Sequence, residues 1–239
     1  MPKVSVIVPN YNYGRFLSQR MESILSQTFQ DMEIILLDDC STDNSQAILS
    51  QYATHPLVSH IVFNEKNSGS PFAQWKKGID LAQGEYIWIA ESDDYCEPTL
   101  LATLVASLNQ YPTAAIAFAG AILVDANGNS TGREFDYWHK HEDSSIRFYS
   151  SKSYFHKLLM WRCSVYNASG ALFRRDLYLH IDKRYATLRY CADWLFWIEM
   201  TLCGDVVEIR KKLNRFRMHT DSVTARFEKT KGVFEEQLI

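Results

Sequence analysis

Three acidic side chains stand within four residues at Glu91-Ser92-Asp93-Asp94, directly after the apolar segment Tyr86–Ala90. Carboxylates this close repel one another unless a cation or hydrogen-bond donors compensate their charge. Oxygen ligands of this kind suit Mg²⁺ or Mn²⁺, which usually bind one or two carboxylates together with substrate phosphates. A solvated acidic turn before the helix after Pro98 is the structural alternative. The position behind an apolar strand favours a metal and phosphate site.

A second acidic pair, Asp38-Asp39, follows the apolar segment Glu33–Leu37. An Asp at such a strand end can accept hydrogen bonds from a base N–H or from ribose hydroxyls. A helix cap at Ser41 or Asp43 explains one polar residue of this stretch, but not two adjacent acids. Alone, the pair is weak evidence for a nucleotide site.

Two single residues could also do chemistry. Asp193 lies at the start of an aromatic-rich helix, where the helix dipole alone favours an acidic side chain. His219 follows the apparent strand Leu213–Met218 and is ambiguous between a ligand and a structural histidine. From the residues alone, both functions stay open.

The elements that position these side chains alternate between strand and helix over residues 1–120. The predicted strands are Val4–Val8, Glu33–Leu37, Val58–Phe63, Tyr86–Ala90 and Ala115–Phe118. The predicted helices are Arg15–Gln27, Asp43–Tyr52, Pro71–Ala82 and a helix from after Pro98 to about Gln110. Apolar strands separated by helices predict an α/β fold, a mostly parallel sheet flanked by helices on both faces. Ligands of such sheets bind beyond the carboxyl ends of the strands, where the acidic residues stand.

The pattern changes after residue 120. Helices are predicted at Lys152–Trp161 and Tyr190–Leu202, strands at Ala168–Phe173 and Leu213–Met218, and a loop over 131–150. Nothing in the sequence is typical of an interdomain linker. We therefore predict a single domain over 1–239, with a nucleotide-binding part (1–120) and a variable second part (121–239).

Composition narrows the function classes. The chain is 46% hydrophobic with a net charge of −3, which argues against a nucleic-acid partner bound by bulk electrostatics. Five scattered cysteines and the lack of a signal peptide or spanning segment predict a cytoplasmic protein with reduced thiols. The dinucleotide fingerprint, the Walker loop and the Gly-x-Ser-x-Gly elbow are absent, which disfavours a dehydrogenase or a P-loop kinase.

Taken together, the sequence resembles the inverting family 2 glycosyltransferases, which have the Rossmann-like GT-A fold. The matching segments lie at 4–12, 23–29, 33–43, 67–69, 84–94, 192–197 and 217–224, in the order and spacing of the family. They include Val-Ser-Val-Ile-Val-Pro-Asn-Tyr-Asn at the start and Glu-Ser-Asp-Asp at 91–94. The match covers nearly the whole chain and is specific to the family rather than to one substrate.

The resemblance implies a role for each matched site residue. Donor binding would involve Pro9, Tyr11, Asp39, Asn67 and Asp93, with Asp39 accepting from uracil and Asp93 directed to the ribose. Asp94, Glu91 and His219 would lie at the Mn²⁺ or Mg²⁺ site, and Asp193 would be the catalytic base. Inverting transfer needs such a base, together with a cation that stabilises the departing nucleoside diphosphate.

Two departures from the family accompany these matches. Glu91 stands where relatives often have Asp, and Phe72-Ala-Gln-Trp-Lys-Lys77 stands where many have an Ala-Arg-Asn stretch. The competing interpretations are a sugar nucleotidyltransferase and a non-catalytic nucleotide-sugar-binding module. The first lacks its Gly-rich phosphate loop here, and the second would lack a separate base such as Asp193.

The expected substrates are a UDP-sugar donor and a saccharide or lipid-linked saccharide acceptor. Contact with the inner face of a membrane is suggested by a basic stretch and an apolar tail, against the equally weighted alternative of a solvated basic face. These residues are Arg210, Lys211, Lys212, Arg215, Arg217, Arg226, Lys229, Lys231, Val233, Phe234 and Leu238.

Overall fold

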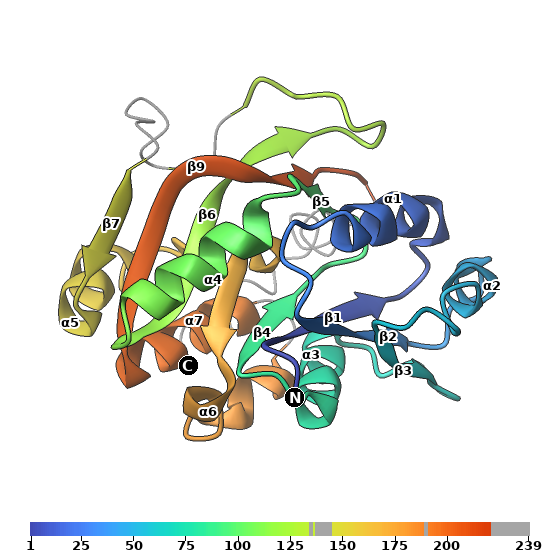
Figure 1. Cartoon of the computed structure of the whole chain (residues 1–239), viewed down its shortest axis with the longest axis horizontal. Coiled ribbons are helices and arrows are strands. Elements are labelled where there is room, and N and C mark those ends of the chain that lie inside the picture. Colours follow the sequence, from blue (N-terminus) through green and yellow to red (C-terminus); the bar gives the residue numbers. More distant parts are fainter. Residues whose placement is uncertain (134–135, 137–144, 189–190, 221–239) are drawn as a thin grey trace.

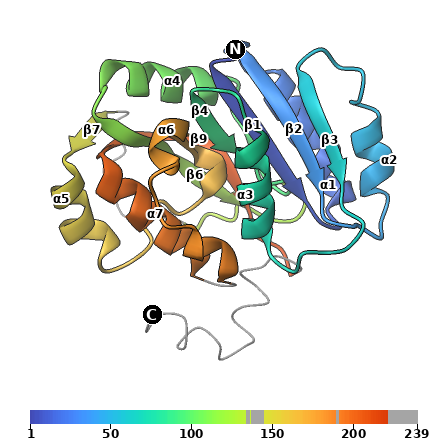
Figure 2. The same cartoon turned by 90° about the horizontal axis from the view of Figure 1, so that it is seen from below.

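A computed structural model describes residues 1–133, 136, 145–188 and 191–220 of the chain. Its centre is a mixed sheet with strand order β3-β2-β1-β4-β8-β6-β9-β5, to which β7 adds by pairing with β9. Helices cover both faces of this sheet (Figures 1 and 2). No helix in the described ranges is long and apolar enough to cross a membrane.

The first half of the sheet is entirely parallel. Its strands are β1 (Val4–Asn10), β2 (Met32–Asp38), β3 (Val58–Phe63) and β4 (Tyr86–Ile89), with β1 between β2 and β4. Every residue of β1 and β2 is buried. Burial on both faces explains why these strands are continuous apolar runs rather than alternating ones. Because Asn10 is the register partner of Asp38, the polar ends of both strands meet at one edge.

Two helical layers enclose the sheet. One face carries α1 (Gly14–Leu25), α2 (Ser45–Ser50) and α4 (Leu100–Gln110), and the other carries α3 (Pro71–Leu81) and α7 (Ala192–Cys203). Successive side chains of a strand point to opposite faces. Val6 accordingly belongs to the core beneath α1 and α4, whereas Ile7 belongs to the core beneath α3 and α7.

The second half of the sheet mixes directions. Strand β8 (Ala171–Arg174) lies antiparallel between β4 and β6 (Ala114–Val124), and β6 runs parallel to β9 (Asp205–Arg217). Short strands β5 (Tyr95–Cys96) and β7 (Ile146–Tyr149) pair with opposite ends of β9. The remaining short elements are α5 (Ser151–Tyr154), a π-turn η2 (Phe155–Leu159), η3 (Ala168–Gly170), α6 (Arg175–Tyr178) and η4 (Lys183–Thr187).

The sequence predictions hold for the first half and need correction in the second. Strand β7 lies within the stretch predicted as a loop, and β9 begins at Asp205 rather than at Leu213. The predicted helix Lys152–Trp161 is one α-turn followed by a π-turn, and Ala168–Gly170 is a 3₁₀ turn rather than strand. These segments take their conformation from distant partners, so local periodicity does not determine it.

Candidate active site

The two adjacent acids after β2 have different surroundings. The first of them, Asp38, connects residues at the carboxyl ends of the parallel strands, the side of the sheet called the acidic edge below. Asp38 is fully buried and accepts hydrogen bonds from the Asn10 amide at 2.8 Å and from the Ser41 main-chain N–H at 2.9 Å. The Gln46 side chain also donates to it at 2.9 Å. Asp38 therefore holds the ends of β1 and β2 together, which gives it a structural function.

Asp39 faces the opposite side, toward the loop before α3. Its Oδ1 accepts from the side chains of Asn64 (2.7 Å) and Gln74 (2.8 Å), and its Oδ2 from the Ser68 hydroxyl (2.7 Å). The Ser68 main-chain N–H also donates to this carboxylate at 2.9 Å. These donors come from the loop after β3 (Asn64 and Ser68) and from the start of α3 (Gln74). Together they fix the orientation of the Asp39 carboxylate.

The other predicted donor residues lie around Asp39. Asn67 donates to the Asp39 main-chain oxygen at 2.9 Å and accepts from Gly69 N–H at 2.7 Å, a turn that needs the positive φ of +77° at Gly69. Pro9 is buried in β1, and its carbonyl accepts from the Ser92 hydroxyl at 2.6 Å. Tyr11, 40% exposed, stands just past the end of β1. These residues are therefore brought to one edge of the sheet, as the sequence analysis predicts.

The acidic segment after β4 turns into the protein at the same edge. Asp94 is almost completely buried; its Oδ1 accepts from the Arg217 main-chain N–H and its Oδ2 from the Asn167 amide, both at 2.9 Å. Burial, together with the nearby charge of Asp93, raises the pKa of Asp94 to about 7. Glu91 accepts from the Trp75 indole N–H at 2.7 Å. Burial raises the pKa of Glu91 to about 8, and the charge of Asp93 adds to that shift.

A histidine from the other end of the described chain meets this segment. His219 Nε2 lies 3.0 Å from Asp93 Oδ2, and its side chain is 2% exposed. The ring packs edge-on against Tyr13, with centroids 5.2 Å apart, and at a tilt against Phe16 at 5.1 Å. Its Nδ1 is buried without a hydrogen-bond partner in the described part of the protein. The predicted proximity of His219 to the acidic segment is thus observed, through Asp93.

Arg217 ties the acidic segment to the rest of the protein. Its guanidinium donates to the main-chain oxygens of Asp93 (2.6 Å) and Ala126 (2.9 Å) and to the Gln19 side chain (2.6 Å). It also lies 4.6 Å from the centroid of the Phe16 ring. At 2% exposure, Arg217 cannot belong to a basic surface, so its assignment to a membrane-facing patch is wrong.

The rest of the predicted basic stretch offers little exposed charge. Arg215 pairs with Glu97, Arg210 pairs with Glu208 at 3.3 Å, and Lys211 is exposed. The tail residues Arg226, Lys229, Lys231, Val233, Phe234 and Leu238 lie outside the described residues.

Asp193 lies in the first turn of α7, on the face of the sheet that also carries α3. Its Oδ1 accepts from the Trp194 main-chain N–H at 2.8 Å, as expected of an acid at a helix start. Burial raises the pKa of Asp193 to about 6, and the main-chain hydrogen bonds oppose that shift. Phe196 and Trp197, one turn further along, are buried. The carboxylate therefore sits at the rim of a rigid aromatic core.

A divalent cation at this place would need oxygen ligands from a substrate phosphate in addition to those from the protein. In the described ranges, no three His, Cys, Asp or Glu side chains converge into a ready-made metal cluster. Mg²⁺ and Mn²⁺ sites of phosphate-transferring proteins need only one or two carboxylates, because phosphate oxygens complete them. Asp94 and Glu91 supply carboxylates at this place, and Nδ1 of His219, which has no hydrogen-bond partner among the described residues, is a further candidate ligand. The residues present fit a cation that binds together with a diphosphate.

A comparison with family models shows which family this chain belongs to. The family model described as "Glycosyl transferase family 2" matches residues 5–181, which contain β1 to β8 and the acidic segment. The chain belongs to glycosyl transferase family 2.

Similar proteins support the family and the fold. Glycosyltransferase GlyG of Streptococcus pneumoniae is 42% identical over 42% of this chain and 33% of its own length. Poly(ribitol-phosphate) beta-glucosyltransferase of Bacillus spizizenii is 40% identical over 39% of this chain and 15% of its own length. These matches span about a third or less of each relative.

The crystal structure of S. aureus TarS 1-349 in complex with UDP-GlcNAc covers 93% of this chain and 60% of that chain, with a TM-score of 0.73 and 20% identity. The shared architecture confirms the GT-A fold predicted from the sequence.

Several residues that hold the acids of this site escaped the sequence analysis, among them Asn64 and Ser68, which donate to Asp39. Gln74, Trp75, Asn167 and Arg217 each hydrogen-bond to an acidic residue of the edge. Gln74 and Trp75 lie in the stretch that departs from the family's Ala-Arg-Asn, which was the available signal. The contacts of Asn167 and Arg217 with Asp94 span 73 and 123 residues of sequence, and no local pattern reports them.

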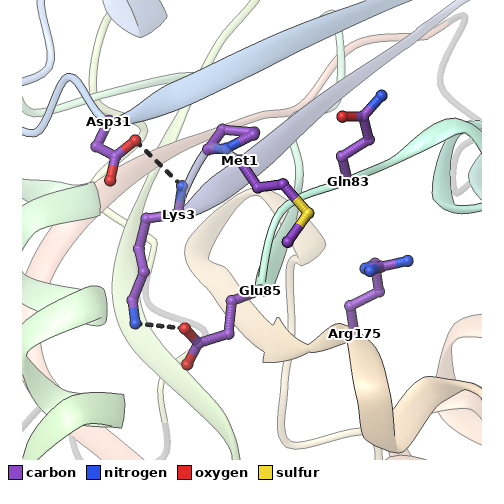
Figure 3. A pocket seen from close by; sticks show the side chains of 7 residues that line it. Met1, Lys3, Asp31, Gln83, Glu85 and Arg175 are labelled. Carbon is purple, nitrogen blue, oxygen red and sulfur yellow. Dashed lines mark hydrogen bonds and ion pairs between the residues drawn. The ribbon is translucent and has the colours of Figure 1, made fainter.

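A shallow pocket of about 270 Å³ lies at the opposite edge of the sheet, where β1 and β4 begin. Figure 3 shows its charged side chains: Lys3 donates through its main-chain N–H to Asp31 at 3.2 Å and pairs through its ammonium with Glu85. Arg175 also lines it and donates to the Gly84 carbonyl at 2.9 Å. The pocket lies away from the acidic edge and is not part of the candidate site.

Proposed function

We propose that this protein is an inverting glycosyltransferase that moves a sugar from a UDP-sugar to a hydroxyl group of a saccharide acceptor. The observation that carries the proposal is the separation of two acidic sites. Asp39, Asp93 and Asp94 gather at the carboxyl ends of the parallel strands, while Asp193 lies on a different element, in the first turn of α7. Inverting transfer needs both a charge-stabilising site for the leaving diphosphate and a separate base.

Asp193 suits the base because its environment matches the task. A general base works best when its pKa lies near the operating pH and its charged form is present. With a pKa raised to about 6, Asp193 is ionised at neutral pH yet basic enough to take the acceptor's proton. As that proton leaves, the acceptor oxygen attacks the anomeric carbon on the face opposite the departing UDP, which inverts its configuration.

On the donor side, Pro9, Tyr11, Asp39 and Asn67 would hold the nucleoside, and Asp93 would face the ribose. The Asp39 carboxylate already accepts hydrogen bonds from Asn64, Ser68 and Gln74. An entering uracil N–H would reach Asp39 Oδ2 when the Ser68 hydroxyl, which donates to that atom, turns away. Support for UDP comes from this acceptor group at the strand end and from TarS, which is titled as a complex with UDP-GlcNAc.

Asp94, Glu91 and His219 are the side chains that would hold Mn²⁺ or Mg²⁺. When bound, the cation would supply positive charge that stabilises the leaving diphosphate. Burial first, and then the nearby charge of Asp93, raises the pKa of Asp94 and Glu91, and a bound cation would offset both causes by favouring the ionised carboxylates.

The proposed acceptor follows from the names of similar proteins. We infer a saccharide or lipid-linked saccharide because relatives carry names such as poly(ribitol-phosphate) beta-glucosyltransferase and chondroitin synthase. A lipid-linked acceptor would place the reaction at the inner face of a membrane. Co-sedimentation with anionic liposomes at low salt tests this, and failure to sediment there contradicts membrane contact.

The experiment that tests the function combines binding with turnover. A thermal-shift panel of UDP-, GDP- and dTDP-sugars, with and without Mn²⁺, should single out a UDP-sugar, because ligand binding raises the melting temperature. The selected donor is then incubated with acceptors, and the anomeric configuration of the product is read by NMR. Binding without turnover would favour the non-catalytic module, and pyrophosphate release from a sugar phosphate and UTP would favour the nucleotidyltransferase.

A further inference from the structure

Trp75 and the preceding Gln74 connect two acidic residues of the candidate site, Glu91 and Asp39. It is 3% exposed and lies in the middle of α3, the helix that follows the Asp39-binding loop. Its indole N–H donates to Glu91 Oε1 at 2.7 Å. The preceding residue, Gln74, donates to Asp39 Oδ1 at 2.8 Å. Two neighbouring residues of one helix thus hold acids from two different strand ends.

The ring of Trp75 reaches the helix of the predicted base. It packs edge-on against Phe196, with centroids 5.6 Å apart and planes at 83°, and lies 6.5 Å from Trp197. Residues three and four apart share one face of a helix, so Phe196 and Trp197 lie on the same side of α7 as Asp193. The Trp75 ring therefore touches the face of α7 that carries Asp193.

The packing around Trp75 leaves it little freedom. Phe72 packs edge-on against it at 5.0 Å from the preceding turn of α3. Phe196 in turn contacts Phe173 of β8 at 5.1 Å and Tyr185 at 5.0 Å. Edge-to-face contacts have preferred geometries, and close-packed cores transmit small displacements. A change at Trp75 would be felt by both Glu91 and α7.

We propose that Trp75 is a positioning residue for sugar transfer: its N–H fixes the Glu91 carboxylate at the donor edge while its ring sets the position of the helix that carries Asp193. This inference rests on the proposed function. It gives a physical reason for the Gln-Trp pair at 74–75, where many relatives have Ala-Arg-Asn. Here the two residues donate hydrogen bonds to Asp39 and Glu91.

The contact itself is testable without turnover. The chain has six tryptophans, and Trp75→Phe removes one indole N–H signal from a ¹H–¹⁵N spectrum and so assigns it. Glu91→Gln should then shift that signal more than any other indole signal. An unmoved Trp75 signal would overturn the proposed contact, whatever the enzyme does.

Kinetics tests the positioning role. Trp75→Phe keeps an aromatic ring but removes the N–H that donates to Glu91, and the loss of a buried hydrogen bond corresponds to about a tenfold change in rate. We expect kcat for transfer to fall about tenfold while the affinity for UDP stays within twofold. Trp75→Phe should add little to Glu91→Leu, because leucine has no acceptor and both changes therefore remove the same bond. Lys76→Ala, which removes an exposed side chain paired with Asp80, is the matched control on α3 and should leave kcat unchanged.

The outcomes distinguish a failure of the positioning role of Trp75 from a failure of the proposed glycosyltransferase function. A kcat within twofold of wild type, or a loss of UDP affinity in proportion to kcat, would overturn the positioning role alone. Fully additive effects of Trp75→Phe and Glu91→Leu would do the same. Wild-type protein that turns over no UDP-sugar would instead overturn the proposed function, and the positioning role with it.

Discussion

The acids of the two parts of the molecule are held in different ways. At the proposed donor edge, which is built around residues of 1–120, Asp39 and Asp94 accept hydrogen bonds from partners between 25 and 123 residues away in sequence. In residues 121–239, Asp193 accepts from an adjacent main-chain N–H and is positioned by the packing of its own helix. Donors on both oxygens fix a carboxylate in one orientation. A base, by contrast, must keep an oxygen available for the acceptor's proton, which local anchoring allows.

The largest effect is expected at the donor edge. Asp94→Asn should lower transfer about 10³-fold or more, because the cation would lose a carboxylate in a buried site where charge stabilisation is worth several kcal/mol. The affinity for UDP should lose its dependence on Mn²⁺, as measured by calorimetry. Asp80→Asn, a surface carboxylate paired with Lys76, is the control and should change neither quantity. Unchanged Mn²⁺ dependence in Asp94→Asn would remove that residue from the metal site.

The next effect concerns the link between the two parts. Arg217→Met keeps packing against Phe16 but leaves the main-chain oxygens of Asp93 and Ala126 without their donor. We expect a loss of about 3 kcal/mol in the free energy of unfolding, measured by denaturant titration. Arg184→Met, which removes an exposed ion pair with Asp182, should cost less than about 1 kcal/mol. Equal losses in the two variants would show that Arg217 is not a structural link.

The pH dependence of turnover reports the base. Burial raises the pKa of Asp193 to about 6, so its ionised form dominates above that pH and disappears below it. With donor and metal saturating, kcat should be flat above about pH 7 and fall about tenfold per unit below pH 6. A profile that stays flat down to pH 5 would contradict a base with this pKa.

A small effect of the opposite sign is expected at Ser68. Its hydroxyl occupies Asp39 Oδ2 at 2.7 Å, where an entering uracil would bind. Ser68→Ala removes this competitor, so the affinity for UDP should rise about threefold, the worth of one neutral hydrogen bond. Ser50→Ala, an exposed hydroxyl on α2, serves as the control for calorimetry. A tenfold loss of affinity would instead make Ser68 a ligand of the donor.

The sequence predicted the donor edge better than the acceptor side, for a physical reason. Strands β1 to β4 are buried on both faces and bounded by helices, so apolar runs and the polar residues after them mark the edge. Strand β7 has exposed residues such as Phe148, and β9 pairs with three strands and shifts its register along β6, so neither gives a continuous apolar run.

Side-chain partners were predictable only where they are local. That Asp193 lies in the first turn of a helix follows from the sequence around it, and the structure agrees. That Arg217 is buried does not follow, because its partners Gln19 and Asp93 are 198 and 124 residues away. A basic stretch predicts a charged surface unless such distant acceptors are known.

The separation of donor binding from proton removal is the central claim, and Asp193→Asn tests it most directly. Removing a general base typically costs about 10²–10⁴ in rate. We expect kcat to fall by that range while UDP and Mn²⁺ affinity, measured on the same preparation, stay within twofold. Glu199→Gln, the same chemical change further along α7, should leave both quantities unchanged. Turnover within a few-fold of wild type, or donor affinity lost in step with kcat, would contradict the account.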